Sequence, residues 1–267
     1  MHTNENWETL FSNLSDEPFS GLSSDLITAT SPLLHSIVDQ SKKVMGDMVE
    51  FKELMMMYTC AMKEIKTKFD VLNTEYNVRY QRNPIKFIGT RLKRPTSIAE
   101  KITRKGLDFT LGNIEERIND VAGVRVICSY VDDIYVIAKA LTQQDDIELV
   151  AQKDYIAFPK NNGYRSLHLI VSIPVFFANQ TKRLKVEVQI RTIAMDFWAS
   201  LEHQLKYKSD SANDPALVSE LRDCAERIAS TDARMLGIRQ RLEANQIAPS
   251  EDAILWEKLR RIDVPIE

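Results

Sequence analysis

The stretch Leu184-Lys185-Val186-Glu187-Val188-Gln189-Ile190 alternates apolar and polar residues without a break. Successive side chains of a β-strand point to opposite faces, so this pattern predicts a strand with one apolar and one polar face. The segment from Leu167 to Ile173 predicts a second strand, and Tyr164, Ser166 and His168 share a face opposite its apolar residues Leu167, Leu169 and Val171. A β-branched run from Val121 to Tyr130 predicts a third strand. A sheet that merely faces solvent would alternate in this way too, but two neighbouring strands with this pattern favour an open polar cleft opposite a helix-covered face.

Apolar residues at helical spacing lie on either side of these strands. The stretch from Ser41 to Tyr80 predicts one or two long amphipathic helices, which Asn83-Pro84 ends. Ser97-Ile98-Ala99-Glu100 has the pattern of a capping box and predicts a helix that starts at Ser97. Two further helices are expected from Ile193 to Lys208 and from Pro215 to Ala244. The sequence therefore predicts an α/β fold with a mixed central β-sheet flanked by helices.

The composition is that of an ordinary globular protein, with 267 residues, 44% hydrophobic and 27% charged. No window approaches the roughly 18 consecutive apolar residues of a membrane span. Residues 1–41 contain no Lys or Arg that could begin a signal peptide. We therefore expect a cytoplasmic protein without membrane contact. The cysteines lie far apart and favour neither a disulfide framework nor a clustered zinc site; they are Cys60, Cys128 and Cys224.

The formal net charge of −3 hides two segments of opposite sign. Every charge in residues 1–41 is acidic, among many Ser, Thr and Asn residues, which predicts an acidic N-terminal extension. Residues 79–105 carry nine basic residues against Glu100 alone, so they produce a strong positive field. We expect three parts: the extension over residues 1–41, a central domain over 42–210, and a helical C-terminal extension over 211–267 with a short helix near 254–259.

Candidate chemistry is concentrated around this basic segment. Its cations surround a predicted helix start, where free amides and the helix dipole also favour phosphate groups. The glycines of a Walker loop are absent, and a solvated basic helix face is the alternative interpretation. Asp120 before one strand and Glu187 within another could meet at Mg²⁺, which one or two carboxylates usually hold together with phosphate oxygens. Cations and a metal site together indicate a nucleoside triphosphate.

The loop from Tyr155 to His168 supplies cations, amides and aromatic rings. Aromatic rings stack on bases, and Lys or Arg side chains pair with phosphates. Tyr164 follows Asn161-Asn162-Gly163, where a ligand-facing role and simple core filling are both open. His168 is either a structural histidine or, because it shares a face with Tyr164, a contact to phosphate or ribose.

Five blocks of sequence carry these residues in order. They are R-L-K-R-P-T-S-I-A-E-K (Arg91–Lys101), D-V-A-G-V-R (Asp120–Arg125), Y-I-A-F-P-K-N-N-G-Y-R-S-L-H (Tyr155–His168), V-E-V-Q-I-R-T (Val186–Thr192) and M-D-F-W-A-S-L-E-H (Met195–His203). Together they resemble the RelA/SpoT synthetase family over roughly residues 42–208. Without hydrolase-type or regulatory domains, the chain looks like a small alarmone synthetase, with motifs closer to the RelP-type than to the RelQ-type subgroup.

The resemblance implies a synthetase with a nucleotidyltransferase-like fold over residues 42–210. The family transfers the β,γ-pyrophosphate of ATP to the 3′-hydroxyl of GTP or GDP, which gives (p)ppGpp and AMP for stringent-response signalling. The implied activity is that of a Mg²⁺-dependent GTP pyrophosphokinase, an ATP:GTP 3′-diphosphotransferase. The resemblance also implies a homo-oligomer, a tetramer in its relatives.

Site residues carried over from the family fall into three sets. The ATP-binding set consists of Arg91, Lys93, Ser97, Lys101 and Arg104. Asp120 and Glu187 are the catalytic and metal set: Asp120 would hold Mg²⁺, and Glu187 would complete the metal site or take the proton of the attacking hydroxyl. The set that binds GTP consists of Tyr164, which would stack on guanine, with Lys160, Arg165, His168 and Gln189. The chain has Asp196 where some members have Asn, so an amide contact to the acceptor base is not carried over.

Two other functions fit the same residues. A nucleotidyltransferase acting on RNA or a small acceptor would also need paired acidic residues and triphosphate binding, but it would release pyrophosphate rather than AMP. A non-enzymatic RNA-binding module could use the basic segment and Tyr164. Such a module would bind RNA with steep salt dependence and would consume no ATP.

Overall fold

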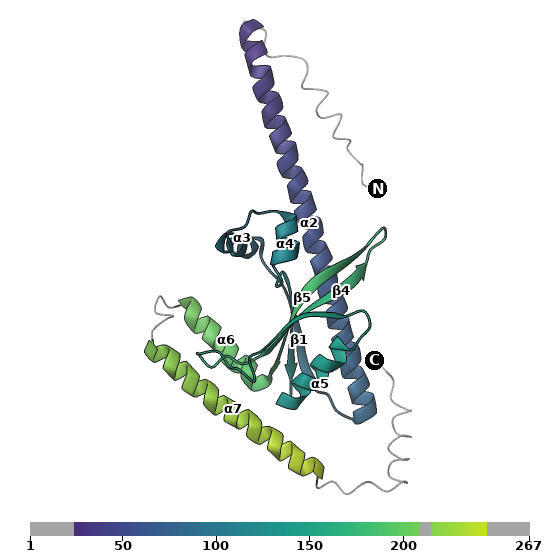
Figure 1. Ribbon diagram of the computed structural model, residues 1–267, viewed down its shortest axis with the longest axis vertical. Coiled ribbons are helices and arrows are strands. Elements are labelled where there is room, and N and C mark those ends of the chain that lie inside the picture. The colour runs from purple at the N-terminus through teal and green to yellow at the C-terminus, as the bar shows by residue number, and fades with distance from the viewer. Residues whose placement is uncertain (1–23, 209–214, 245–267) are drawn as a thin grey trace, which may run out of the picture. The chain divides into compact units, whose positions relative to one another are not determined.

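The computed structural model describes residues 24–208 and 215–244 of the chain (Figure 1). The chain divides into two compact units, one up to Glu53 and the other from Leu54 onward. Helix α2 (Ser24–Tyr80) has residues in both, and all the features below belong to the second unit. None of the described helices is long and apolar enough to cross a membrane. The helix predicted near residues 254–259 lies outside the described residues.

A five-stranded sheet forms the centre of the second unit, in the order β1-β2-β5-β4-β3. Strands β2 and β5 pair in parallel, and every other neighbouring pair is antiparallel. The mixed sheet and its flanking helices confirm the predicted fold class. The bounds of the strands are β1 Ile85–Leu92, β2 Ala122–Cys128, β3 Glu148–Asp154, β4 Leu167–Phe176 and β5 Thr181–Thr192.

Strands β2, β4 and β5 match the three strands expected from sequence, whereas β1 and β3 were not predicted. Both of these strands form sheet edges, and four of the eight residues of β1 and five of the seven of β3 are exposed. An edge strand needs no sustained apolar face, and edges commonly carry charged residues that block pairing with other chains. Because β1 lies within the basic segment over residues 79–105, its sequence shows no strand pattern.

Five more helices, α3 to α7, follow α2 along the described chain (Figure 1). Their bounds are α3 Pro95–Arg104, α4 Leu111–Arg117, α5 Val131–Thr142, α6 Ile193–Lys208 and α7 Pro215–Ala244. The bounds of α6 and α7 confirm the prediction. The expected capping box at Ser97 is wrong, because α3 starts at Pro95 and its N-cap, Arg94, makes no side-chain capping bond. Proline favours the first helical position, since its φ angle is already helical and its missing N–H is not needed there.

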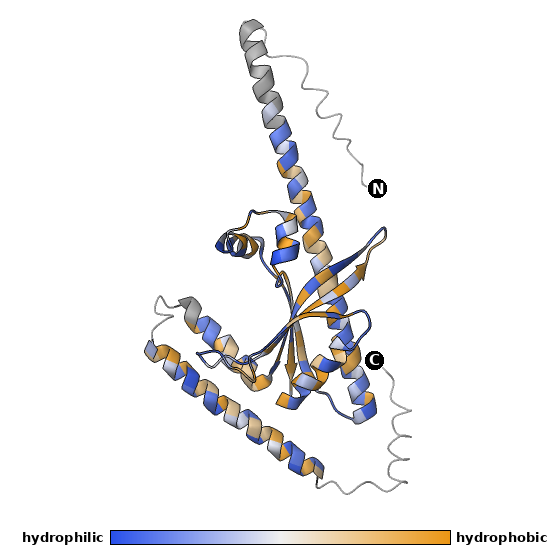
Figure 2. Cartoon of the chain, viewed as in Figure 1, coloured by the Kyte–Doolittle hydropathy of each residue, from blue (hydrophilic) through white to orange (hydrophobic). Residues whose placement is uncertain are grey.

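The core lies between the apolar face of the sheet and its helices. Alternate residues of β2, β4 and β5 are buried, and Figure 2 shows apolar residues concentrated in these strands. The largest fully buried side chains of α2 and α5 include Tyr58, Ile65, Phe69, Ile137 and Leu141. With one sheet face packed in this way, the polar residues of the same strands lie on the other face.

Candidate active site

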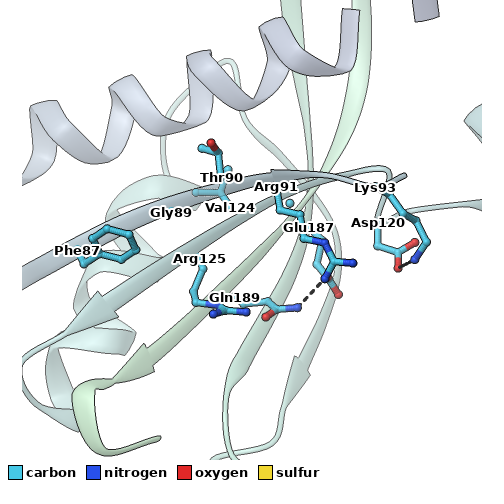
Figure 3. Close-up of a pocket in the computed structure, with 11 residues that line it drawn as sticks. Phe87, Gly89, Thr90, Arg91, Lys93, Asp120, Val124, Arg125, Glu187 and Gln189 are labelled. Atoms are coloured by element: carbon cyan, nitrogen blue, oxygen red, sulfur yellow. Dashed lines mark hydrogen bonds and ion pairs between the residues drawn. The ribbon is translucent and has the colours of Figure 1, made fainter. Parts of the chain in front are cut away.

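A cavity of about 490 Å³ opens on the polar face of the sheet (Figure 3). Its charged lining combines three cations with two carboxylates. The charged and amide residues of the lining are Arg91, Lys93, Arg125, Asp120, Glu187 and Gln189; the others are Phe87, Gly89, Thr90, Gly123 and Val124. Two of the five residues predicted to bind ATP, Arg91 and Lys93, therefore share one cavity with both predicted catalytic carboxylates.

The strand register explains why these residues meet. Arg91 of β1 pairs with Gly123 of β2, which in turn pairs with Glu187 of β5. The absence of a side chain at Gly123 leaves open space between the other two. Residues paired in adjacent strands share a face of the sheet, so the guanidinium and carboxylate groups belong to one side. The next row of paired residues is Gly89, Arg125, Gln189 and His168, and the first three of these line the cavity.

Asp120 lies two residues before the start of β2 and is held between two lysines. Lys93 Nζ lies 2.9 Å from its Oδ2, and Lys101 Nζ lies 2.7 Å from its Oδ1. The backbone N–H of Lys93 donates to the carbonyl of Val121 at 2.8 Å, which fixes Lys93 beside Asp120. Burial raises the pKa of Asp120, but the hydrogen bonds from Lys101 and Lys93 outweigh it and bring the pKa below its ordinary value. Asp120 is therefore an ionised carboxylate.

Glu187 is the second carboxylate, and both of its oxygens have partners. His168 Nδ1 lies 3.4 Å from Oε1, and Gln189 Nε2 donates to Oε2 at 2.9 Å. Burial raises the pKa of Glu187, yet the contact with His168 and the hydrogen bond from Gln189 leave it below its ordinary value. Glu187 is thus ionised and can accept a proton.

Arg191 lies at the centre of the hydrogen-bond network beside Glu187. Its side chain is only 5% exposed. Its guanidinium donates to Tyr164 Oη and Gln189 Oε1 at 2.7 Å each, and to Ser166 Oγ at 3.3 Å. A buried arginine is stabilised only when its donors are satisfied. Arg191 thereby fixes Tyr164, which is predicted to stack on guanine, and Gln189, which donates to Glu187.

Tyr164 is half-buried and surrounded by the other predicted acceptor residues. Its hydroxyl lies 2.8 Å from His168 Nε2, and burial raises the pKa of the phenol, so it is protonated at neutral pH. Lys160 Nζ lies 4.6 Å from the centre of the Tyr164 ring and 4.7 Å from that of Tyr155. The Trp198 ring lies 6.4 Å from Tyr164, centroid to centroid. Tyr164 thus packs against neighbouring rings and also belongs to the hydrogen-bond network of His168 and Arg191.

Three predicted site residues lie apart from these clusters. Ser97 and Arg104 are on α3 but do not line the cavity, and Arg104 is exposed. Arg165 lies in the loop before β4 and donates to the carbonyl of Ile156 at 3.3 Å. Together with residues of α6 and α7 it lines a small separate cavity. The ligand contacts of these three residues stay predictions.

The structure adds functional candidates that were not predicted from sequence. Arg125 lines the cavity, has a buried Nε without a hydrogen-bond partner, and lies 3.4 Å from Asp196. Asp196 also contacts Arg191 at 3.3 Å. The alternation of β2 could have revealed Arg125, because it lies two residues beyond Gly123 and therefore on the same face. The burial of Arg191 has no comparable signal in the sequence.

Asp120 and Glu187 are the residues of this cavity that could hold a divalent cation. Among the described residues, no cluster of three or more His, Cys, Asp or Glu side chains could hold a metal by itself. Asp120 and Glu187 nevertheless line the same cavity, and both are ionised. Such a pair suits Mg²⁺, which usually completes its coordination with phosphate oxygens and water.

Comparisons with known proteins place this fold and cavity in a family. The family model described as "Region found in RelA / SpoT proteins" matches residues 90–212. The GTP pyrophosphokinase YwaC of Bacillus subtilis is 44% identical over 206 residues, which are 77% of this chain and 97% of YwaC. The GTP pyrophosphokinase YjbM of the same species is 38% identical over 74% of this chain and 93% of YjbM.

A solved structure agrees with these relatives. The crystal structure of small alarmone synthetase 1 from Bacillus subtilis, bound to its product pppGpp, superposes with a TM-score of 0.66 at 36% identity. The match covers 73% of this chain and 98% of that one. The class defined by fold and cavity is thus that of the nucleotide pyrophosphokinases. This chain belongs to the RelA/SpoT family, and within that family it matches small alarmone synthetases along nearly their whole length.

Proposed function

We propose that this chain transfers the β,γ-pyrophosphate of ATP to the 3′-hydroxyl of GTP or GDP, forming (p)ppGpp and AMP. The observation that carries the proposal is one cavity in which the cations of the ATP-binding set adjoin Glu187. Tyr164 and Gln189 are linked to that carboxylate through His168 and by direct hydrogen bonding. The family's names and the pppGpp-bound relative support the same reaction.

The donor half of the site would act by neutralising charge. Arg91 and Lys93 line the cavity, and Lys101 reaches it through Asp120, so a triphosphate there would meet several cations at once. Phosphoryl transfer depends mainly on positioning and on electrostatic stabilisation of the phosphate oxygens. Mg²⁺ held by Asp120 and Glu187 would supply further charge neutralisation on the phosphates.

The acceptor half would supply the nucleophile. The 3′-oxygen of the guanosine nucleotide would attack the β-phosphorus of ATP, and the bond from that phosphorus to the α,β-bridging oxygen would break. AMP then leaves with the bridging oxygen. Glu187 is the candidate acceptor for the hydroxyl proton, because it is ionised and lies in the same cavity.

Product analysis tests the proposal. The protein is incubated with Mg²⁺, ATP and GTP, and the nucleotides are separated by ion-exchange chromatography. AMP together with a guanosine nucleotide that has gained two phosphates is the expected result. Release of pyrophosphate would instead indicate a nucleotidyltransferase, and RNA binding without ATP consumption would indicate an RNA-binding module.

A matched pair of lysine variants tests the donor site. Lys93→Ala should raise the KM for ATP roughly tenfold or more, because it removes a cation that faces the phosphates. Lys66 also pairs with an aspartate, Asp70, but on the exposed surface of α2. Lys66→Ala should therefore leave both KM values at the wild-type level. Equal losses for ATP and GTP in Lys93→Ala would contradict a dedicated donor site.

Self-association is the remaining part of the proposal. We infer a homo-oligomer because α6 and α7 expose large apolar side chains, which monomeric proteins seldom gather in one region. These side chains are Ile193, Phe197, Leu201, Leu205, Met235, Ile238 and Leu242. Light scattering coupled to size exclusion would give the mass, and a monomer at micromolar concentration would contradict this inference. The cytoplasmic location stays a prediction from sequence.

A further inference from the structure

Helix α7 follows the segment that the RelA/SpoT family model matches, yet it touches the acceptor loop directly. Gly163, the residue before Tyr164, has a φ of 86° and faces this helix. A Cβ atom placed on Gly163 would overlap the Cβ of Ala225 and lie 3.3 Å from the Cα of Arg222. Loop and helix approach this closely because one residue has no side chain and the other only a methyl group.

The contact between Gly163 and Ala225 lies next to Tyr164. A buried cluster joins α6 to α7 and consists of Trp198, Ala199, Leu221 and Ala225. Tyr164 packs against this cluster, and so do Leu217 and Ile228 of α7. Trp198 Nε1 donates to the carbonyl of Leu221 at 2.9 Å, which ties the indole ring to α7. The position of the Tyr164 ring is therefore set by α6 and α7 on one side and by Arg191 and His168 on the other.

Further contacts anchor α7 to the catalytic unit. Thr192, the last residue of β5, donates its hydroxyl proton to Asp232 Oδ2 at 2.5 Å. Arg239 pairs with Asp132 at the start of α5. Figure 1 shows α7 running beside α6, and both helices belong to the same compact unit as the sheet. The helix is thus fixed at several points, and a change in its contact with Gly163 must be absorbed by the loop.

We propose that α7 forms the back wall of the guanosine site and that Ala225 is a positioning residue for the guanosine nucleotide. This inference rests on the proposed function, because it concerns the acceptor of that reaction. A larger side chain at residue 225 would push the loop outward and move the Tyr164 ring. No residue of α7 lines the cavity that holds Arg91, Lys93 and Asp120, so the donor site should be unaffected.

The test compares the same substitution at two alanines of α7. Ala225→Leu adds volume against the loop, whereas Ala233→Leu adds it at an exposed position of the same helix. AMP formation is measured against GTP concentration at saturating ATP, and then against ATP at saturating GTP. Ala225→Leu should raise the KM for GTP roughly tenfold, the range expected when a stacked base is displaced. Its KM for ATP and its kcat at saturating GTP should stay within about twofold of wild type, and Ala233→Leu should match wild type.

A second variant and a second readout cover loss of folding. If circular dichroism shows that Ala225→Leu is unfolded, Ala225→Ser serves instead, with a smaller rise in the KM for GTP alone. Trp198 fluorescence, recorded in a chain with Trp7 and Trp256 replaced by Phe, reports GTP binding next to α7 without any turnover. Ala225→Gly removes the methyl group, adds no overlap with the loop, and should keep wild-type GTP affinity.

The outcomes separate this inference from the proposed function. An active wild type together with a folded Ala225 variant whose KM for GTP is unchanged would overturn the inference and leave the function standing. Equal rises in both KM values would overturn it too. If wild type makes no AMP, the proposed function fails, and the GTP titration followed by Trp198 fluorescence decides the inference alone. Wild type that also fails to bind GTP would overturn both.

Discussion

Arg191 and Arg183 lie eight residues apart on β5 and offer a matched test of buried hydrogen bonding. Each guanidinium makes several hydrogen bonds, yet the Arg191 side chain is 5% exposed and that of Arg183 is 46% exposed. Replacing each by Met keeps most of the aliphatic volume and removes the charge and the donors. The two variants therefore differ mainly in the burial of the partners that they leave behind.

Arg191→Met should lower the free energy of unfolding by about 3–5 kcal/mol, the range for removing one partner from a buried charged network. It would leave Gln189 Oε1 and Ser166 Oγ without their arginine donor, and Asp196 with Arg125 alone. The separate losses do not add, because Tyr164 keeps its contact with His168 and water can replace some donors. Arg183→Met should cost about 0–1 kcal/mol, since exposed ion pairs contribute little.

Urea denaturation followed by circular dichroism gives both values from the midpoint and the slope. Native proteins are stable by about 5–15 kcal/mol, so Arg191→Met should stay folded at 25 °C with a clearly lower midpoint. Its affinity for GTP should fall while the affinity for a non-hydrolysable ATP analogue changes little, because Tyr164 and Gln189 lose a shared donor. An Arg191→Met variant within about 1 kcal/mol of Arg183→Met would refute the assignment of a stabilising role to the buried network.

Three further changes test other parts of the structure. Asp120→Asn keeps the size of the side chain but removes its charge, so AMP formation should fall by roughly 100-fold or more while circular dichroism shows that the protein stays folded; near wild-type turnover would exclude a metal-binding role. Gly163→Ala and Gly106→Ala both place a side chain at positive φ, but only the first meets a neighbouring helix, so the first should lower the melting temperature much more; equal shifts would contradict the close approach of α7. Burial raises the pKa of Asp232 although Thr192 and Arg165 lower it, so its contribution to stability is present at low pH and is lost as pH rises through the folded-state pKa. Asp232→Asn should therefore gain stability relative to wild type as pH rises from about 4 to 8, measured by thermal unfolding, and a difference independent of pH would contradict this.

The sequence predicted those parts of the fold and site that follow from local periodicity. Glu187 was recognised because it is a polar residue inside an alternating strand, and the register of β5 with β2 brings it to the same cavity as Asp120. Strands β1 and β3 were not predicted, because an edge strand that is largely exposed has no apolar pattern to reveal it.

Features that depend on tertiary packing could not be predicted from sequence. The burial of Arg191 results from its position at the end of β5, where Ser166, Tyr164 and Asp196 surround it. The contact between Gly163 and α7 joins segments far apart in the chain. Local pattern carries no information about such distant neighbours, which is why the burial of Arg191 and the contact with α7 became evident only from the structure.

The parallel pairing of β2 with β5 also has a consequence for the order of events during folding. Gly123 and Glu187 become neighbours only through this pairing, and α5, β3 and β4 lie between them in the chain. Parallel strands need a long crossover, and contacts between distant segments form slowly because loop closure must precede them. The carboxylates of Asp120 and Glu187 are therefore apart in any partly folded chain in which β2 and β5 have not paired. Recovery of catalysis during refolding should accordingly lag behind the recovery of helical signal, and truncated chains that end before β5 should be inactive even where their helices have formed.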